Sequence, residues 1–142
     1  MIAIGSDHGG FGLKVEVIKH LKEKGYEVKD VGCYNTDSVD YPKYGHLVGE
    51  SVVSGESEFG IVICTTGIGI SMAANKVKGV RCALCSETHS ARLTREHNDA
   101  NVLALGGGLI GINMAKDIVD TFLSTKASEE EKHQRRVQQI EL

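Results

Sequence analysis

The chain has 142 residues, 41% of them hydrophobic, and its 16 lysines and arginines against 19 aspartates and glutamates give a formal net charge of −3. This length favours one domain, residues 1–142, with enough apolar side chains to build a hydrophobic core. The slightly acidic balance argues against a general nucleic-acid binder or a membrane-surface protein, because both depend on a basic electrostatic field.

Strand and helix patterns alternate along the chain. The apolar runs that predict buried strands are Ile2–Gly5, Tyr26–Val31, Phe59–Cys64, Val80–Cys85 and Asn101–Leu105. The predicted helices begin, in chain order, after the loop Ser6–Gly10, at Pro42, after the loop Thr65–Ser71, at Glu87, after Gly106–Gly108 and at Ser128–Glu131.

Residues with special backbone or capping properties set the ends of these helices. Gly25 is expected to stop the first helix, and the second ends near Gly55. Ser86 is placed to cap the helix Glu87–His97. Ser128–Glu131 has the spacing of a capping box, with acidic residues where the helix dipole favours them.

Five strands with apolar interiors, separated by helices, indicate a parallel sheet that is covered on both faces. The predicted fold class is therefore α/β: a single doubly wound domain with a five-stranded parallel sheet of Rossmann or flavodoxin-like type, flanked by helices and followed by a C-terminal helix. In a strand order of 2-1-3-4-5, the winding reverses between the first and third strands. Ligands of such sheets bind at the carboxyl ends of the strands beside that point.

Polar groups follow these two strands. Asp7 and His8 come after the first strand, and Cys64 ends the third. A helix amino terminus next to Cys64 would lower the pKa of its thiol, so that it could act as base or nucleophile; the alternative is a small core residue. Gly67 and Gly69 would let backbone N–H groups converge on an anion, or they form only a tight turn.

Other candidates are supported by weaker patterns. His8 could hold a phosphate or hydroxyl, or it is an ordinary loop residue. His97 is either an acid–base group or a favourable residue at a helix carboxyl end, with Asn98 at C′. Lys132 and Arg136 are four residues apart on a predicted helix, so they could grip one phosphate or simply form a solvated face.

Two motifs are set aside. Gly106, Gly108 and Gly111 fit a dinucleotide fingerprint, but no strand follows them to supply the ribose-binding acid. Cys82 and Cys85 have the spacing of a zinc half-site, yet residues three apart on a strand face opposite ways. No metal or cofactor is predicted. With no leader or membrane-spanning pattern, the cysteines are expected to be reduced thiols of a cytoplasmic protein.

Taken together, these residues resemble the type B ribose-5-phosphate isomerases and the related galactose-6-phosphate isomerase subunits. The stretches that carry the resemblance, spread over nearly the whole chain, are Gly5–Gly9, Asp40–Pro42, Gly60–Ser71, Ala73–Lys76, Arg95–Asp99 and His133–Arg136. The resemblance implies an aldose–ketose isomerase that interconverts ribose 5-phosphate and ribulose 5-phosphate through an enediolate. It implies no metal or cofactor, because the chemistry needs only proton transfers.

The resemblance also implies roles for single residues. Cys64 would be the general base, and Thr66 with nearby backbone N–H groups would stabilise the enediolate. His97 would open the sugar ring, and Asp7 would orient a substrate hydroxyl. The other residues implied to bind substrate are His8, Tyr41, Thr65, Gly67, Ile68, Gly69, Ile70, Asn98, Lys132 and Arg136.

Three positions depart from the family pattern. Thr65 stands where the family usually has glycine, and Gly108 stands where ribose-type members commonly carry an arginine for the phosphate. Lys132 replaces another arginine, which exchanges a bidentate fork for a point charge. Two of these three changes weaken the implied phosphate binding, which keeps the identity of the sugar open.

The resemblance further implies a homodimer or dimer of dimers, in which His97 and Asn98 of one subunit complete the site of the other. An isomerase of the same chemistry that acts on a hexose 6-phosphate or another sugar phosphate is the nearest alternative. A non-catalytic nucleotide-binding module is a more remote one, since this fold serves many functions. A redox module that uses Cys82 and Cys85 is the least favoured.

Overall fold

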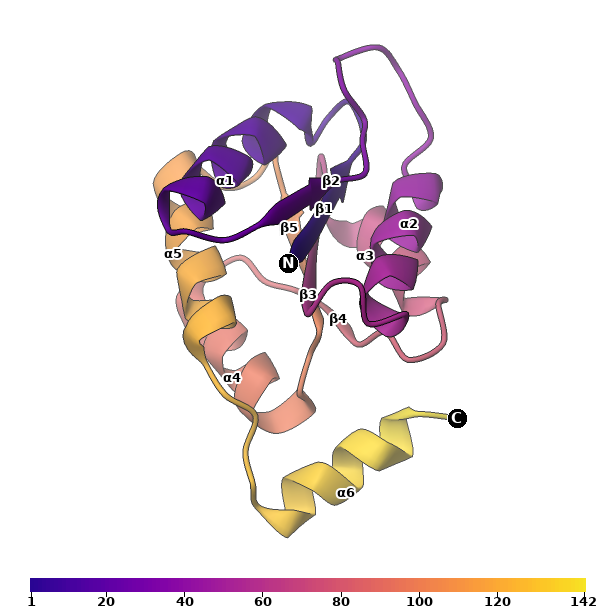
Figure 1. The fold of residues 1–142 in the computed structure, drawn as a ribbon, viewed down its shortest axis with the longest axis vertical. Coiled ribbons are helices and arrows are strands. Elements are labelled where there is room, and N and C mark those ends of the chain that lie inside the picture. The colour runs from indigo at the N-terminus through magenta and orange to yellow at the C-terminus, as the bar shows by residue number, and fades with distance from the viewer.

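Five parallel strands form a single sheet in the order β2-β1-β3-β5-β4 (Figure 1). The computed structural model describes residues 1–142. The strands are β1 (Ile2–Ser6), β2 (Val28–Asp30), β3 (Phe59–Cys64), β4 (Cys82–Leu84) and β5 (Val102–Gly106). The predicted α/β class with a five-stranded parallel sheet is confirmed.

Helices cover both faces of the sheet. They are α1 (Phe11–Glu23), α2 (Pro42–Val53), α3 (Ile68–Asn75), α4 (Thr88–Asn98), α5 (Ile112–Ser124) and α6 (Glu131–Ile140). Crossovers between parallel strands are right-handed, so steps in opposite directions along the sheet place their helices on opposite faces. Accordingly α1, α4 and α5 pack on one face and α2 and α3 on the other, while α6 rests against α4 (Figure 1). None of these helices combines the length and apolarity that a membrane crossing requires.

The predicted order of the last two strands is wrong, because β5 inserts between β3 and β4. Every residue of β5 is buried, as is usual for a central strand, whereas β4 ends at the exposed Leu84 and lies at the edge of the sheet. Both edge strands, β2 and β4, have only three residues, fewer than predicted. Short edge strands leave few unpaired backbone groups. The reversal of winding between β1 and β3 is unaffected by this exchange.

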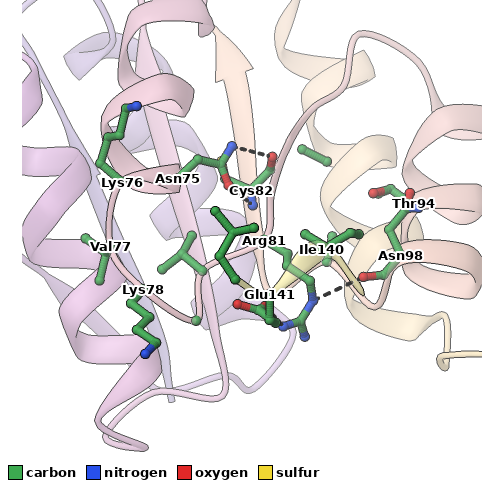
Figure 2. A pocket seen from close by; sticks show the side chains of 15 residues that line it. Asn75, Lys76, Val77, Lys78, Arg81, Cys82, Thr94, Asn98, Ile140 and Glu141 are labelled. Atoms are coloured by element: carbon green, nitrogen blue, oxygen red, sulfur yellow. Dashed lines mark hydrogen bonds and ion pairs between the residues drawn. The ribbon is translucent and has the colours of Figure 1, made fainter. Parts of the chain in front are cut away.

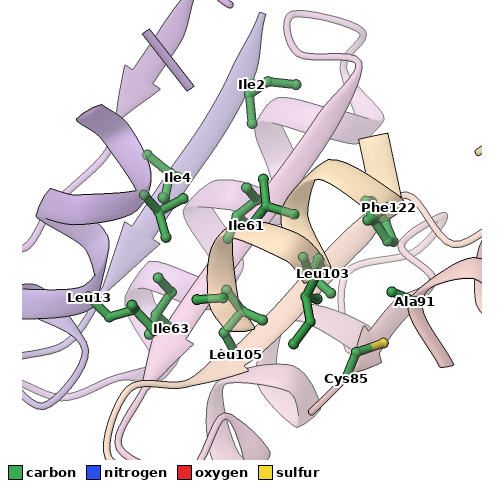
Figure 3. Packing of buried hydrophobic residues seen from close by; sticks show 14 of the residues in the cluster. Ile2, Ile4, Leu13, Ile61, Ile63, Cys85, Ala91, Leu103, Leu105 and Phe122 are labelled. Atoms are coloured by element: carbon green, nitrogen blue, oxygen red, sulfur yellow. The ribbon is translucent and has the colours of Figure 1, made fainter. Parts of the chain in front are cut away.

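The core consists of two apolar layers, one on each face of the sheet. Alternate residues of a strand point to opposite faces, so Ile2 and Ile4 belong to the layer under α1, α4 and α5, and Ala3 belongs to the layer under α2 and α3. Figure 3 shows the first layer, in which isoleucines of β1 and β3 lie beside leucines of β5. Cys85 lies in this layer and Cys82 packs against the other, so the prediction that they face opposite ways is confirmed.

The ends of α1 and α2 agree with prediction, but those of α4 differ by one residue. Ser86 does not cap α4; instead the carboxylate of Glu87 accepts a hydrogen bond from Ser90 N–H at 3.0 Å. Serine is among the residues most often found at helix N-caps, and the prediction of Ser86 as the cap followed from this preference. At the other end, Asn98 is still helical, and Asp99 rather than Asn98 takes the left-handed conformation, with φ +44°.

Two further helix starts differ from prediction. The predicted loop Thr65–Ser71 is shorter, because α3 begins at Ile68 directly after the N-cap Gly67, whose backbone is left-handed with φ +78°. The capping box predicted at Ser128–Glu131 does not form. Helix α6 begins at the last residue of that stretch, and the serine hydroxyl accepts a hydrogen bond from the N–H of the N-cap residue.

Candidate active site

The carboxyl ends of β1, β3 and β5 bring three segments together. Gly107 N–H donates to the Cys64 carbonyl and Gly108 N–H donates to the Thr65 carbonyl, each at 2.8 Å. Gly9, after β1, lies so close to Thr65 that an added Cβ would be 2.1 Å from its Oγ1. The convergence predicted for the ends of the first and third strands is therefore confirmed. We call residues 7–9, 41, 64–70 and 106–108 the Cys64 edge.

Cys64 is the last residue of β3 and pairs with Gly106 of β5. Its Sγ accepts a hydrogen bond from Gly67 N–H at 3.1 Å, just before the first turn of α3. The side chain packs with the apolar layer under α2 and α3, and the residue is only 5% exposed. A backbone donor thus holds the sulfur at the boundary between the core and the carboxyl edge of the sheet.

The first turn of α3 supplies further donors beside the sulfur. Ile68 N–H donates to Thr66 Oγ1 at 3.2 Å, and a hydroxyl that accepts in this way keeps its own proton for another acceptor. Gly69 and Ile70 come next in the helix, where N–H groups have no carbonyl of their own helix to bond. This region was predicted as a loop, but a helix start offers the same convergence of N–H groups with a more rigid geometry.

Asp7 and His8 lie on the same edge in different environments. Asp7 is buried, and its Oδ1 accepts a hydrogen bond from Gly10 N–H at 2.9 Å. His8 is exposed, and its Nδ1 accepts a hydrogen bond from Val39 N–H at 3.2 Å. With Nδ1 accepting, the proton of the neutral ring lies on Nε2. The backbone therefore fixes the orientation of the His8 ring and leaves Nε2 as its donor.

Two further predicted binding residues also lie on the Cys64 edge. The ring of Tyr41 lies against Gly69, where an added Cβ would be 2.6 Å from the tyrosine Cζ. Thr65 occupies the space between two glycines, since a Cβ on Gly108 would be 2.9 Å from its Cγ2, opposite the contact with Gly9. A larger side chain at residue 108 would therefore compete with the threonine for the same space.

His97 and Asn98 are not brought to Cys64 within the same chain. Arg81, just before β4, donates from Nε to the backbone carbonyl of Asn98 at 3.1 Å, which fixes this end of α4 at the amino edge of the sheet. Cys64 instead pairs with Gly106 at the opposite end of β5. At about 3.3 Å per residue, a strand of five residues separates the two edges by about 16 Å.

Lys132 and Arg136 share the exposed α6, at the opposite end of Figure 1 from the β2–α2 connection. Lys132 Nζ lies 3.5 Å from a carboxylate oxygen of Glu130. His133, which has no predicted role, stacks on His97 with 4.6 Å between the ring centroids. The two histidines lie on separate helices, so their spacing in the sequence does not predict that they touch. The contact is seen only in the packing of α6 on α4.

A hollow of about 770 Å³ lies at the amino edge, lined by residues that include Arg81 and Asn98 (Figure 2). Arg81 crosses it to reach Glu141 at 2.8 Å, and Asn98 forms part of its wall. A smaller cavity of about 270 Å³ borders Thr66 and Gly106 on the Cys64 edge. The polar groups of the Cys64 edge and the 770 Å³ hollow are therefore at opposite edges of one chain.

The thiols of Cys82 and Cys85 are poorly suited to reactions. Burial, reinforced by the charge of Glu87, raises the pKa of Cys85 to about 11. Burial and the neighbouring Cys85 raise the pKa of Cys82 further. Thiols that resist ionisation are weak nucleophiles, which disfavours the redox reading. No group of three or more histidine, cysteine or acidic side chains gathers where it could hold a metal ion.

Comparison with known proteins gives consistent similarities. The model of the Ribose/Galactose Isomerase family matches residues 2–140. Ribose-5-phosphate isomerase B of Escherichia coli K12 is 50% identical over 98% of this chain and 93% of its own. Galactose-6-phosphate isomerase subunit LacB of Clostridium acetobutylicum is 43% identical over 89% of this chain and 73% of its own. The structure of Clostridium thermocellum ribose-5-phosphate isomerase B is 54% identical, with a TM-score of 0.96 over 98% of this chain and 93% of that one.

Proposed function

The chain belongs to the ribose/galactose isomerase family, and we propose that it interconverts ribose 5-phosphate and ribulose 5-phosphate. The observation that carries the proposal is the Cys64 thiol, held by Gly67 N–H at the start of α3. Proton abstraction next to a carbonyl requires a base and nearby donors for the negative charge that forms on the oxygen. On the Cys64 edge, a candidate base and such donors lie within residues 64–70.

In this mechanism Cys64 acts as the general base. Its thiolate removes the proton from the carbon next to the substrate carbonyl and returns it to the former carbonyl carbon, so the enediolate exists between two proton transfers. The Thr66 hydroxyl and the free N–H groups of Gly69 and Ile70 stabilise the charge on the enediolate oxygens. No redox step or external reactant is needed for this exchange.

The remaining groups bind and prepare the sugar. Asp7 orients a hydroxyl and His8 donates to the phosphate, both from the Cys64 edge. His97 opens the ring, and Asn98 binds a hydroxyl. Since the latter two lie at the amino edge of their own chain, they reach a thiol only if they come from a second subunit. We therefore propose a homodimer or dimer of dimers with sites shared between subunits.

Lys132 and Arg136 complete the phosphate site from the same partner. They lie on α6, which packs on α4 and carries the His133 ring stacked on His97. A subunit that delivers His97 to a neighbouring Cys64 edge thus delivers α6 beside it. Both side chains are exposed, and charged groups of this kind bind phosphate through charge-assisted hydrogen bonds.

A hexose 6-phosphate is the second candidate substrate. Gly108 contributes no side chain to the Cys64 edge, and Thr65 takes the space that a longer residue there would need. Lys132 offers a point charge that is already near Glu130. The phosphate site is therefore less strongly cationic than an arginine-lined one, so it selects less strongly for the phosphate position of a pentose.

The test is the rate of isomerisation of ribose 5-phosphate and a panel of hexose 6-phosphates by the wild type and by Cys64→Ser. We expect ribose 5-phosphate to have the highest kcat/KM, and Cys64→Ser to lower kcat at least about a hundredfold, as loss of a general base does. Cys82→Ser is the matched control and keeps wild-type turnover. Unchanged turnover in Cys64→Ser would remove this thiol from the mechanism, and a preferred hexose phosphate would favour the second candidate.

A further inference from the structure

Lys14 in α1 is a lysine with no solvent exposure. Its Nζ donates to Asp30 Oδ1 at 2.6 Å and to the backbone carbonyl of Cys33. The rings of Phe11 and Tyr34 lie 5.5 and 5.3 Å away, measured from Nζ to their centroids. A buried ammonium is tolerated only when it is paired and hydrogen-bonded. All of its oxygen partners lie on one segment, the end of β2 and the chain directly after it.

This ion pair fixes one end of the long connection between β2 and α2, residues 31–41, which rises beyond the sheet at the top of Figure 1. The same Asp30 carboxylate oxygen accepts a hydrogen bond from Gly32 N–H at 2.9 Å. The Tyr34 hydroxyl donates to the Asp30 carbonyl at 3.1 Å. Lys14 therefore sits at the centre of the contacts that shape the start of the connection.

The other end of the connection reaches the Cys64 edge. Val39 N–H donates to His8 Nδ1, which sets the orientation of the imidazole ring and leaves the proton on Nε2. Two residues later, Tyr41 lies against Gly69 in the first turn of α3. No other segment gives His8 a side-chain hydrogen bond, so the position of the connection determines which way this ring faces.

We propose that Lys14 is a positioning residue, whose buried ammonium holds the β2–α2 connection in the shape that directs His8 and Tyr41 to the substrate. The proposal rests on the function proposed above. Lys14 is enclosed and does not touch the sugar phosphate; it acts through the connection. Because the connection carries groups that bind substrate and not the base or its donors, its displacement affects binding more than the chemical step.

The first experiment measures kcat and KM for ribose 5-phosphate in Lys14→Met. We expect KM to rise about tenfold, because this is the effect of losing one hydrogen bond between the substrate and a charged group. We expect kcat to stay within about threefold of the wild-type value. Val17→Ala is the matched control, because Val17 is buried on the same helix and its side chain has no polar group that could bond the connection. We expect this variant to be less stable than the wild type and to have an unchanged KM. Equal KM values in wild type and Lys14→Met would reduce Lys14 to a structural role and overturn the proposal.

A second variant covers the case in which Lys14→Met does not fold. Lys14→Met/Asp30→Asn removes both charges, so that no buried charge is left without a partner. We expect the same rise in KM. Combining this pair with His8→Ala should raise KM by less than the product of the two separate increases, because groups that act through one another are not additive. Fully additive effects would show that Lys14 and His8 act independently.

A readout without catalysis separates this proposal from the proposed function. In 15N NMR spectra of the free protein, the Nδ1 resonance of His8 reports whether it accepts the Val39 N–H. We expect it to shift in Lys14→Met/Asp30→Asn and to stay in place in Val17→Ala. An unmoved resonance overturns the positioning role. A moved resonance in a protein that isomerises no sugar phosphate supports the positioning role and refutes the proposed function.

Discussion

At the scale of single residues, the backbone of Gly67 sets the position of the thiol. Its φ of +78° lies in the left-handed region, and an added Cβ would be 2.5 Å from Leu84 Cδ1 and 2.8 Å from the carbonyl carbon of Leu105. We expect Gly67→Ala to lower the free energy of unfolding by about 3 kcal/mol, through conformational strain and overlap together. The value is measured by urea unfolding, and kcat should fall as well, because the N–H directed at Cys64 Sγ is displaced.

Gly55 provides the control for this change, because its φ of +82° is nearly the same and an added Cβ would meet nothing within 4 Å. Gly55→Ala should therefore cost only the conformational part, about 1 kcal/mol, with kcat unchanged. Equal decreases in the free energy of unfolding in the two variants would mean that the surroundings of Gly67 adapt to a methyl group, so that the close contacts do not destabilise the variant.

The sequence predicts some of these residues and misses others for a physical reason. Asp7, His8 and Cys64 were predictable because the ends of parallel strands meet at one edge, so position along the chain implies proximity. The burial of Lys14 was not predictable, because a lysine side chain on a helix is usually exposed to solvent. Its partner Asp30 is 16 residues away on a strand, and only the packed fold brings the two charges together.

At the scale of elements, the start of α4 depends on the charge of Glu87. Hydrogen bonds from the hydroxyl and the backbone N–H of Ser90 lower the pKa of Glu87 below its usual value. A carboxylate with a lowered pKa in the folded state contributes stability at pH values above its unfolded pKa, and this is lost as pH falls through the folded value. We expect Glu87→Gln to lower the melting temperature at pH 7 and to have a smaller effect at pH 3, which lies below the unfolded pKa of about 4.3.

Calorimetric melting curves at both pH values check this expectation. Glu129→Gln is the matched control, because Glu129 is exposed and precedes α6 without capping it. This variant should melt like the wild type at either pH. If Glu87→Gln were as destabilising at pH 3 as at pH 7, the contribution would come from the shape of the side chain and not from its charge.

The elements themselves were predicted unevenly. The residue range of β3 agrees with its apolar run, and β1 is one residue longer than predicted, because both are buried on two faces and bounded by polar loops. The exchange of β4 and β5 was not visible in the sequence, since each apolar run fits any place in a parallel sheet. The start of α3 at Ile68 was missed because a left-handed N-cap glycine resembles a loop glycine until the backbone is seen.

At the scale of the whole molecule, the proposed site residues fall into two groups at opposite edges of the sheet, Cys64 at one and Asn98 at the other. Apolar side chains remain exposed around the Cys64 edge, with Ile68 46%, Met72 63% and Leu109 68% accessible. The amino edge offers the large hollow beside Asn98 (Figure 2). Grouped apolar exposure next to polar functional residues is typical of interaction surfaces. In a symmetric pair, the same two surfaces meet twice, which yields two complete sites.

This arrangement predicts that two inactive variants restore each other. Cys64→Ser and His97→Asn are each expected to lack activity as homodimers. Unfolding and refolding an equal mixture gives half heterodimers, each with one intact site built from the Cys64 of one chain and the His97 of the other, so about one quarter of wild-type kcat should return by symmetry. The control is Cys64→Ser alone, unfolded and refolded in the same way. No recovery in a mixture whose heterodimers are verified by mass spectrometry would mean that Cys64 and His97 do not share a site across subunits.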